Sequence, residues 1–275
     1  MGEVSLPSDV ANCPEVVQVL PQGKAYVFRG FRGQMLRSPE DFEEHQALVG
    51  EAGLYMDPVL AKNRRKYIQF VKQLRGKGIV CFSLHADEHC GIFFVTKKSG
   101  ALRFICDARR TNARFKPPPC VKLPTGEAFS RIHLSEGEVM YGAGLDLKDY
   151  FHSMTIPVEM RSFFALPSLS AAEAGVCEVG GIAVSLETQI YPCFCTLPMG
   201  FSWAMWAAQA AHEEVVARAQ IDTRMVQDRS DFVSLKDGPV SAVYVDNYAC
   251  FALSQEEATA NRDKVRQVAE DMGFI

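Results

Sequence analysis

The sequence predicts an α+β protein in which short strands pair as hairpins and helices begin at recognisable caps. Two features support this class. Two pairs of apolar strands flank turn residues, and several other segments carry helix caps or helical spacing. The chain has 275 residues, of which 48% are hydrophobic and 23% charged. This composition is typical of a globular protein and excludes a collagen-like, coiled-coil or largely disordered chain.

The first part of the chain carries few structural signals until two helix caps appear. Residues 1–57 are expected to form an N-terminal lead-in whose first 37 residues show little periodicity. Ser38, followed by proline, predicts a short helix that runs to about Gly50. Asp57, also followed by proline, predicts a second helix with one apolar stripe, which ends at Gly76.

A stretch rich in β-forming residues follows these helices. Apolar residues at 92–95 and 102–106 flank a basic turn at 97–100, and together they predict a hairpin with a basic tip. Three consecutive prolines at 117–119 predict a stiff extended connector. A buried strand is expected over residues 140–147.

The second half of the chain predicts an insertion and a buried helix. Residues 168–186 are small and Gly-containing, which indicates a loop or a hairpin insertion. Ser202 is expected to cap a helix over residues 203–219. The first turns of that helix are apolar on nearly every side, so we expect it to be buried. Residues 220–240 are polar and are expected to form a loop.

The last part of the chain predicts a second hairpin and a final helix. Apolar residues at 242–245 and 248–251 flank Asp246-Asn247, which predicts a two-residue turn. Ser254 and Glu257 form a capping box at the start of the last helix, which extends to about residue 272.

The charge distribution separates the chain into basic and acidic parts. The whole chain has a net charge of −4, but residues 61–122 carry 15 Lys and Arg against 3 acidic residues. Such a segment can form a phosphate-binding face, although a solvated helix surface explains it equally well. Nine scattered cysteines favour free thiols in a reducing compartment. The N-terminus lacks a secretory signal, so we expect a cytoplasmic or nuclear protein that is neither secreted nor membrane-bound.

Two acidic sites are candidates for metal chemistry. Asp146 stands at the end of a predicted buried strand, and Asp246 stands at the tip of a predicted hairpin. Two carboxylates brought together repel each other, and a divalent cation such as Mg²⁺ would relieve that repulsion. Each site also has a simpler interpretation. Asp146 can cap nearby backbone, and Asp246 with Asn247 can serve only as turn residues.

The order of several segments carries a family resemblance. They are Phe-Ile-Cys-Asp-Ala-Arg-Arg-Thr-Asn at 104–112, Lys-Leu-Pro-Thr at 122–125, Leu-Asp-Leu-Lys-Asp-Tyr-Phe at the start of 145–157, Leu-Pro-Met-Gly-Phe at the start of 197–204, Tyr-Val-Asp-Asn at 244–247 and Asp-Met-Gly-Phe at 271–274. In this order they resemble the motifs of the reverse transcriptase family, in its retrotransposon and retrovirus-like branches. The resemblance covers about residues 60–275, and the shared order is a stronger signal than any single motif.

The resemblance implies a polymerase fingers-palm over residues 58–275, with fingers at about 58–139 and palm at about 140–275. It implies an antiparallel palm sheet backed by helices, and the thumb is expected to be absent. A longer polyprotein or another chain would supply a thumb or RNase H. The implied activity is that of an RNA-directed DNA polymerase, a nucleotidyltransferase of a transposable element. It would use an RNA template, a DNA primer, a dNTP and two Mg²⁺ or Mn²⁺ ions. The alternative is a catalytically inactive palm remnant that binds nucleic acid or a protein partner.

The resemblance also implies roles for individual residues. The catalytic positions are Asp146, Asp246 and Asn247, and the metal ligands are Asp146, Asp246 and the Leu147 carbonyl oxygen. The nucleotide-binding positions are Lys97, Lys98, Arg103, Asp149, Tyr150, Phe151, Met199 and Gly200, with Phe151 as a steric gate against a ribose 2′-hydroxyl. The template-primer positions are Arg109 and Tyr244.

Three positions depart from the family pattern. Asn247 stands where the family has a second Asp, so metal affinity is expected to fall. Met199 stands where Gln or Phe is frequent, and Tyr150 stands where a small Ala is usual. Other clusters are weaker signals. Cys81, His85, His89 and Cys90 lack the paired spacing of a zinc site, and His152 and His212 are expected to be packed or hydrogen-bonded rather than catalytic.

Overall fold

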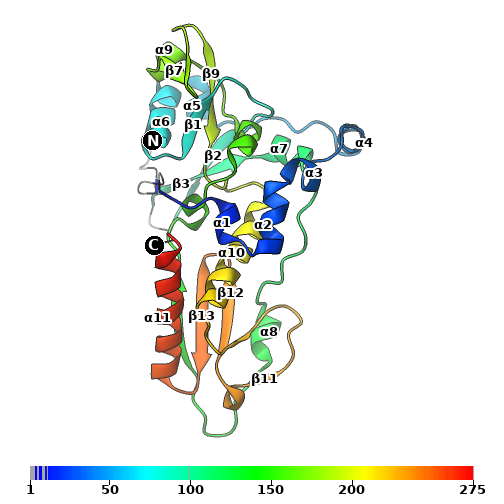
Figure 1. Ribbon diagram of the computed structural model, residues 1–275, viewed down its shortest axis with the longest axis vertical. Helices are drawn as coiled ribbons and strands as arrows, with labels where there is room; N and C mark the ends of the chain where they lie inside the picture. Colours follow the sequence, from blue (N-terminus) through cyan, green and yellow to red (C-terminus); the bar gives the residue numbers. More distant parts are fainter. Residues whose placement is uncertain (1–3, 5, 8–9, 11, 99, 275) are drawn as a thin grey trace. The chain divides into compact units, whose positions relative to one another are not determined.

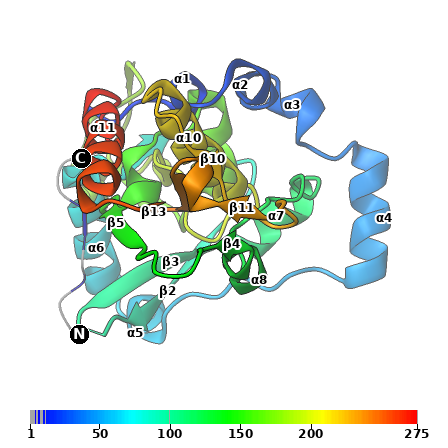
Figure 2. The same ribbon diagram turned by 90° about the horizontal axis from the view of Figure 1, so that it is seen from below.

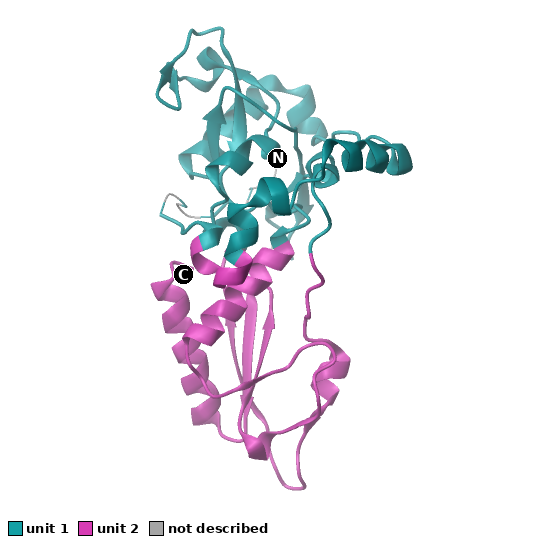
Figure 3. Ribbon diagram, turned by 45° about the vertical axis from the view of Figure 1, so that its right-hand side comes forward, with its two compact units in different colours: residues 1–17, 25–118, 151–204 teal, residues 18–24, 119–150, 205–275 magenta. Residues whose placement is uncertain are grey.

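The computed structural model describes residues 4, 6–7, 10, 12–98 and 100–274. The chain divides into two compact units, which Figure 3 shows in different colours. Unit 1 comprises residues 1–17, 25–118 and 151–204, and unit 2 comprises residues 18–24, 119–150 and 205–275. Each unit therefore combines segments that are far apart in the sequence.

Unit 1 is built from short helices and small antiparallel sheets (Figure 1). Its helices are α3 (Phe31–Gln34), α4 (Pro39–Val49), α5 (Pro58–Lys62), α6 (Arg64–Gly76), α7 (Arg109–Arg114), the 3₁₀ helix η2 (Val158–Phe164) and α9 (Ala171–Ala174). Its strands are β1 (Val80–Ser83), β2 (Gly91–Thr96), β3 (Leu102–Asp107), β6 (Leu169–Ser170), β7 (Glu178–Val179), β8 (Ile182–Ala183) and β9 (Gln189–Phe194). The helices α1 (Val16–Val19), α2 (Gln22–Arg29), η1 (Tyr150–Ser153) and α10 (Ala204–Arg218) carry residues of both units.

Two strand arrangements organise unit 1. Strands β2 and β3 form an antiparallel hairpin whose register runs from Gly91↔Asp107 to Thr96↔Leu102. This confirms the predicted hairpin, although Ser99 of its turn lies outside the described residues. In the other sheet, β9 lies between β1 and β6, so β1 is an edge strand.

Aromatic side chains fill part of the core of unit 1. Phe115 packs edge-on against Phe163 and Phe201, with ring centroids 5.5 and 5.0 Å apart. Phe201 also packs edge-on against Phe164, at 4.8 Å. Edge-to-face pairs of this kind add about 0.5–1.5 kcal/mol each beyond the area they bury. The cluster fixes the segment after residue 200 to the rest of unit 1.

Unit 2 is organised around a four-stranded sheet in the order β10-β12-β13-β5. Its elements are α8 (Gly126–Ser130), β4 (Ile132–His133), β5 (Tyr141–Asp146), β10 (Arg224–Met225), β11 (Val233–Ser234), η3 (Leu235–Asp237), β12 (Val240–Tyr244), β13 (Asn247–Ala252) and α11 (Gln255–Asp271), with most of α10. Strand β13 pairs antiparallel with both β12 and β5, whereas the short β10 runs parallel to β12. The predicted antiparallel sheet is therefore correct except at this edge.

Helices α10 and α11 back the sheet on one side (Figure 2). Helix α11 begins at Ser254, whose hydroxyl accepts a hydrogen bond from the Glu257 amide at 3.1 Å. It buries Ala258, Val265 and Ala269, which lie at helical spacing. These helices agree with the helices predicted over 203–219 and up to residue 272.

Other sequence-based expectations need correction. The segment before Ser38, for which the sequence predicted no elements, contains the helices α1, α2 and α3. The helix predicted from Asp57 to Gly76 is interrupted at Asn63, whose side chain caps α6 by accepting from the Lys66 amide. The second hairpin turn is Val245–Asp246 rather than Asp246–Asn247, since Tyr244 pairs with Asn247. The boundaries at residues 58 and 140 stay predictions.

Candidate active site

Asp146 and Asp246 lie at the same end of two neighbouring strands of unit 2. Asp146 is the last residue of β5, and Asp246 directly precedes Asn247, the first residue of β13. The register pairs Asp146 with Asn247, and the Leu147 amide donates a hydrogen bond of 2.8 Å to the Asp246 carbonyl oxygen. The sheet therefore brings together two acidic residues that are one hundred positions apart in the sequence.

The turn that presents Asp246 is strained. Val245 has a φ of +55°, which is a rare conformation for a β-branched residue. Two side chains of α10 hold it there. The Val245 amide donates to Gln209 Oε1 at 2.8 Å, and the Val245 carbonyl oxygen lies 2.8 Å from His212 Nδ1. Both backbone groups of the strained residue are thus satisfied by one helix, which fixes the direction of the turn.

His212 is neutral in this arrangement. Burial is the main cause that lowers its pKa to about 4, against the weaker opposing effects of the Val245 carbonyl and Glu213. Since the Val245 carbonyl oxygen only accepts, Nδ1 carries the proton and donates it. Nε2 is buried and has no hydrogen-bond partner among the described residues. The expectation that His212 is packed or hydrogen-bonded agrees with its burial and with its contact with Val245.

The residues beside the two carboxylates differ in exposure. Asp146 and Asn247 are exposed, whereas Asp246 is half-buried. Asn247 Nδ2 donates a hydrogen bond of 2.9 Å to Asp246 Oδ1, so the amide already engages one carboxylate oxygen. Tyr244, at the end of β12, is 50% exposed and is available for contact with a ligand.

Asp149 and Tyr150 follow β5 and have different environments. Asp149 is half-buried and adopts a φ of +51°. Tyr150 is only 2% exposed, and its hydroxyl donates to the Ala208 carbonyl oxygen at 3.0 Å. Burial, and then the charges of Asp246 and Glu213, raise its pKa. This burial does not favour the predicted contact between the Tyr150 side chain and a nucleotide.

The donor set around the turn suits a hard divalent cation. Within the described ranges, no group of three or more His, Cys, Asp or Glu side chains could hold a metal ion. Asp146 and Asp246 nevertheless offer two carboxylates, and the role of the Leu147 carbonyl oxygen stays a prediction. Mg²⁺ usually keeps several waters and binds through one or two carboxylates together with substrate phosphates. The residues present therefore fit an ion that substrate phosphates complete, and they do not fit a fully protein-built metal cage.

The remaining predicted site residues belong to unit 1. Lys97 and Lys98 lie between β2 and β3, and Arg103 is exposed on β3. Arg109 begins α7 and is exposed, but Asp107 engages its guanidinium in two hydrogen bonds of 2.8 Å. Phe151 is half-buried. The grouping of these residues with the carboxylates of unit 2 stays a prediction.

The loop at Met199 and Gly200 docks on strand β3 of unit 1. The Cys106 amide donates to the Met199 carbonyl oxygen at 2.9 Å. Gly200 has a φ of +120°, and a Cβ there would overlap the Cys106 carbonyl oxygen. Asn112 braces the same loop, because its amide donates to the Gly200 carbonyl oxygen and accepts from the Ser202 amide. The close approach of the Gly200 loop to Cys106 therefore requires a glycine at position 200. This requirement comes from packing within unit 1 and does not depend on a bound ligand.

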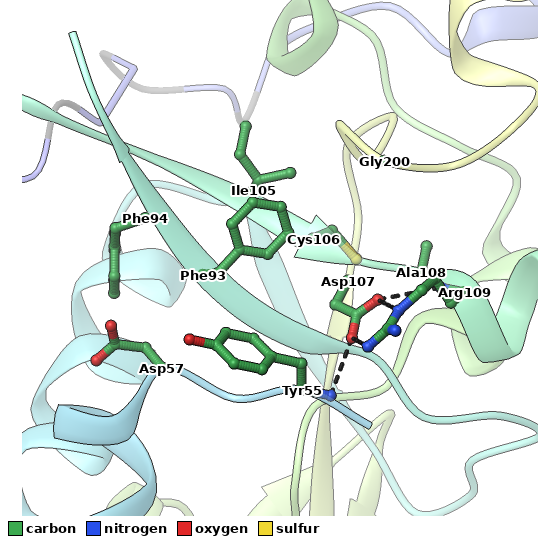
Figure 4. Close-up of a pocket in the computed structure, with 10 residues that line it drawn as sticks. All are labelled: Tyr55, Asp57, Phe93, Phe94, Ile105, Cys106, Asp107, Ala108, Arg109 and Gly200. Atoms are coloured by element: carbon green, nitrogen blue, oxygen red, sulfur yellow. Dashed lines mark hydrogen bonds and ion pairs between the residues drawn. The ribbon is translucent and has the colours of Figure 1, made fainter. Parts of the chain in front are cut away.

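A cavity of about 520 Å³ also lies in unit 1 (Figure 4). Figure 4 shows the aromatic rings of Tyr55 and Phe93 on one side and the Asp107–Arg109 ion pair on the other. The Tyr55 amide donates to Asp107 Oδ2 at 2.9 Å, and hydrogen bonds from Arg109 are the largest effect lowering the pKa of Asp107. Sequence analysis missed Tyr55, because it lies in the segment interpreted as a lead-in.

Sequence analysis assigned no supporting role to the residues that hold the Val245 turn and the Gly200 loop in place. Gln209 and His212 grip the Val245 turn, and Asn112 grips the Gly200 loop. Gln209 had a visible signal, since it is the one polar residue among the first eight residues of α10. Asn112 stands in a quoted family segment but had no assigned role.

Comparison with known proteins supports the fold. No protein family model matches the sequence, and no curated protein matches it. The chain is similar to the structure of a foamy viral protease-reverse transcriptase in complex with double-stranded DNA, with a TM-score of 0.55 and 14% identity over 100% of this chain. It also matches a prototype foamy virus protease-reverse transcriptase mutant, with a TM-score of 0.49 and 18% identity over 82% of this chain. The chain spans 35% and 24% of the lengths of those proteins.

The fold class follows from this similarity and from the elements described above. The chain has an α+β fold that resembles the fingers-palm of a reverse transcriptase. Among the described residues, none of the helices combines the length and the apolar character needed to cross a membrane.

Proposed function

We propose that this chain is the fingers-palm part of an RNA-directed DNA polymerase of a mobile element. The observation that carries the proposal is the placement of Asp146 and Asp246 at the same end of adjacent strands, beside a strained turn. Backbone strain of this kind costs about 1–3 kcal/mol, and it tends to persist where function needs it. The reaction is templated nucleotidyl transfer from a dNTP to a DNA primer on an RNA template.

The carboxylates of unit 2 hold the reacting groups in this proposal. Asp146, Asp246 and the Leu147 carbonyl oxygen would hold two Mg²⁺ or Mn²⁺ ions, whose remaining ligands would include phosphates of the dNTP. When bound, the ions supply activation of the primer 3′-hydroxyl and charge neutralisation of the leaving pyrophosphate. The protein contributes positioning and fixed charge, which supply most of the catalysis in phosphoryl-type transfers.

The basic residues of unit 1 bind the substrates. Lys97, Lys98 and Arg103 contact the triphosphate, and Arg is suited to grip phosphate oxygens in a bidentate manner. Phe151 acts as the steric gate that favours deoxynucleotides. These assignments rest on the order of motifs in the sequence. A Phe151→Val variant is expected to incorporate ribonucleotides more readily, and no gain would remove the gate from the proposal.

Template and primer bind mainly through their phosphates. Arg109 and Tyr244 are proposed to contact them, and affinity is expected to fall steeply with salt because bound counterions are released. A filter-binding titration at several salt concentrations measures this slope. A slope near zero would contradict a nucleic-acid partner.

A non-catalytic palm remnant is the second candidate, and Asn247 favours it. Asn247 replaces a carboxylate and donates a hydrogen bond to Asp246, which leaves fewer free oxygens for a cation. Such a chain would still bind nucleic acid or a protein partner, but it would not extend a primer.

Primer extension on an RNA template distinguishes these functions. The wild-type chain, Asp146→Asn and Asp246→Asn are compared in Mg²⁺ and in Mn²⁺, with Asp222→Asn as the matched control because Asp222 is exposed and stands outside the site. The polymerase proposal expects extension by the wild type and the control and a loss of at least about 100-fold in the two site variants. If the wild type only equals Asp146→Asn while still binding template-primer, the remnant is the correct function.

A further inference from the structure

Helix α10 carries three side chains on one face that take part in a network around the Val245 turn. Trp206, Gln209 and Glu213 are three and four residues apart in turn, so they share one face of the helix. Gln209 is only 3% exposed, and Glu213 is half-buried. Every residue of this network belongs to unit 2. The network can therefore be described without reference to unit 1.

Three hydrogen bonds fix the orientation of the Gln209 amide. The Val245 amide donates to Gln209 Oε1 at 2.8 Å. Gln209 Nε2 donates to the Val243 carbonyl oxygen and to Glu213 Oε1, at 3.0 Å each. If the two amide atoms of Gln209 changed places, its NH₂ group would face a donor and its oxygen would face two acceptors. The Glu213 carboxylate therefore helps to keep Oε1 directed at the turn.

Lys24 on α2 holds the Glu213 carboxylate in place. Its Nζ lies 3.3 Å from Glu213 Oε2, which is the oxygen that Gln209 does not engage. The ammonium group also lies 5.7 Å from the centroid of the Trp206 ring, in a cation–π contact. The side chains of Lys24 and Glu213 are 37% and 30% exposed. Without Lys24, the carboxylate is free to turn toward water and away from Gln209.

We propose that Lys24 is a positioning residue for the turn that presents Asp246. Lys24 orients the Glu213 carboxylate, which accepts from Gln209 and so fixes the amide of that residue. Gln209 in turn accepts from the Val245 amide, directly before Asp246. A residue of the N-terminal segment, far in the sequence from the predicted motifs, thus supports the candidate metal site. Only the effect on catalysis rests on the proposed function, because the network holds the turn without a ligand.

Hydrogen exchange of the ligand-free full chain, followed by NMR, tests the network. The exchange rate of the Val245 amide reports how often its hydrogen bond to Gln209 opens. In Lys24→Gln this amide is expected to exchange about two- to fivefold faster than in the wild type, as expected from loss of a partly exposed ion pair. Lys24→Arg keeps the charge and should restore the rate. The control is Arg218→Gln, which removes the 2.8 Å ion pair with Glu214 on the same helix and should leave this rate unchanged.

The amides of β13 separate a local effect from a general loss of stability. General destabilisation of unit 2 speeds the exchange of the β13 amides and of the Val245 amide together, whereas the positioning role predicts a change at Val245 alone. A Lys24→Gln variant in which both speed up by the same factor, or in which neither changes, would overturn the proposal.

A charge swap tests whether the effect passes through Gln209. Lys24→Glu combined with Glu213→Lys restores an ion pair, but it removes the acceptor for Gln209 Nε2, because an ammonium group only donates. We expect the unfolding free energy to recover toward the wild-type value, while the Val245 amide still exchanges about two- to fivefold faster than in the wild type. A swap that also restores the exchange rate of Val245 would refute the path through Gln209.

Primer extension measures the effect on catalysis. Lys24→Gln is expected to lower kcat about two- to fivefold and to leave the KM for dNTP nearly unchanged, because the variant disturbs the turn and removes no proposed nucleotide contact. A rise in KM at unchanged kcat would contradict the positioning role. A wild-type chain without extension activity would remove the proposed function alone, since the exchange measurements need no substrate and still decide whether Lys24 holds the turn.

Discussion

Acidification is expected to destabilise unit 2 through His212. The imidazole is buried on α10, donates from Nδ1 to the Val245 carbonyl oxygen, and has no partner for Nε2 among the described residues. A proton added to Nε2 in the folded state would therefore be a buried charge without a hydrogen bond. The rings of Tyr150 and Tyr248 pack beside it at centroid distances of 5.7 and 6.4 Å, and burial raises the pKa of both. Glu213 is the acidic side chain that opposes the effect.

The size of the effect follows from the two pKa values of His212. The pKa is about 4 in the folded chain, and it is about 6.5 in an unfolded chain. Between these values the unfolded chain binds more protons, so stability falls as the pH is lowered from about 6.5 to about 4. The loss is about 2 kcal/mol at about pH 5 and approaches about 3 kcal/mol below about pH 4.

Urea unfolding at two pH values measures this term when a matched variant removes the titration. His212→Gln keeps an amide that can donate to Val245 but cannot take up a proton near neutral pH. Other groups titrate in both proteins, so the readout is the difference in unfolding free energy between wild type and His212→Gln. This difference is expected to shrink by about 2 kcal/mol from about pH 7 to about pH 5.

The control is His133→Gln, because His133 is exposed on β4 of the same unit. Its difference from the wild type should stay constant between the two pH values. If the His212→Gln difference also stays constant, the inference that His212 is buried and neutral is wrong.

Three further outcomes are expected from the contacts described above. Gly200→Ala should lower the stability of unit 1 by about 1–3 kcal/mol in urea unfolding, because the new Cβ overlaps the Cys106 carbonyl oxygen. The control is Gly126→Ala, whose new Cβ meets no atom within 4 Å. This control should leave the unfolding free energy nearly unchanged. Ser254→Ala removes the cap of α11 and should cost about 1 kcal/mol by urea unfolding; an unchanged midpoint would refute the capping role. Asn247→Asp should lower the melting temperature measured in a chelator, because the added carboxylate repels its acidic neighbour. Mg²⁺ should raise the melting temperature of this variant more than that of the wild type, because the cation neutralises both carboxylates. Equal Mg²⁺ responses of variant and wild type in thermal shift measurements would contradict a cation site.

Local signals predicted the elements that depend on neighbouring residues. The basic hairpin, the helix after Ser202 and the capped helix after Ser254 are specified within about twenty residues of sequence each. The helices before Ser38 were missed, because they are short and their burial depends on distant partners. The turn at Val245 was placed one residue late, since Asp and Asn are the usual turn residues and a valine at positive φ has no local signal.

The candidate site was predictable in part for the same reason. Strand ends and hairpin turns are local features. The sequence alone therefore predicted that Asp146 ends a strand and that Asp246 lies in a hairpin turn. The pairing of β5 with β13 is not local, and it required the structure. The supporting side chains Gln209 and His212 were not predictable as a pair, because their partner is the backbone of a strained residue rather than another side chain.

The strained turn bears on the choice between polymerase and remnant. Holding Val245 at positive φ costs about 1–3 kcal/mol, and the hydrogen bonds that Val245 makes with Gln209 and His212 offset that cost at about 0.5–1.5 kcal/mol each. A chain with no use for the position of Asp246 would gain stability from Gly or Asn at 245, which adopt this conformation more readily. Val245 and its two supporting side chains are instead all present, whereas Asn247 taken by itself favours the remnant. The supported, strained turn is expected of a site whose geometry is still used, and it favours the proposed polymerase over a remnant.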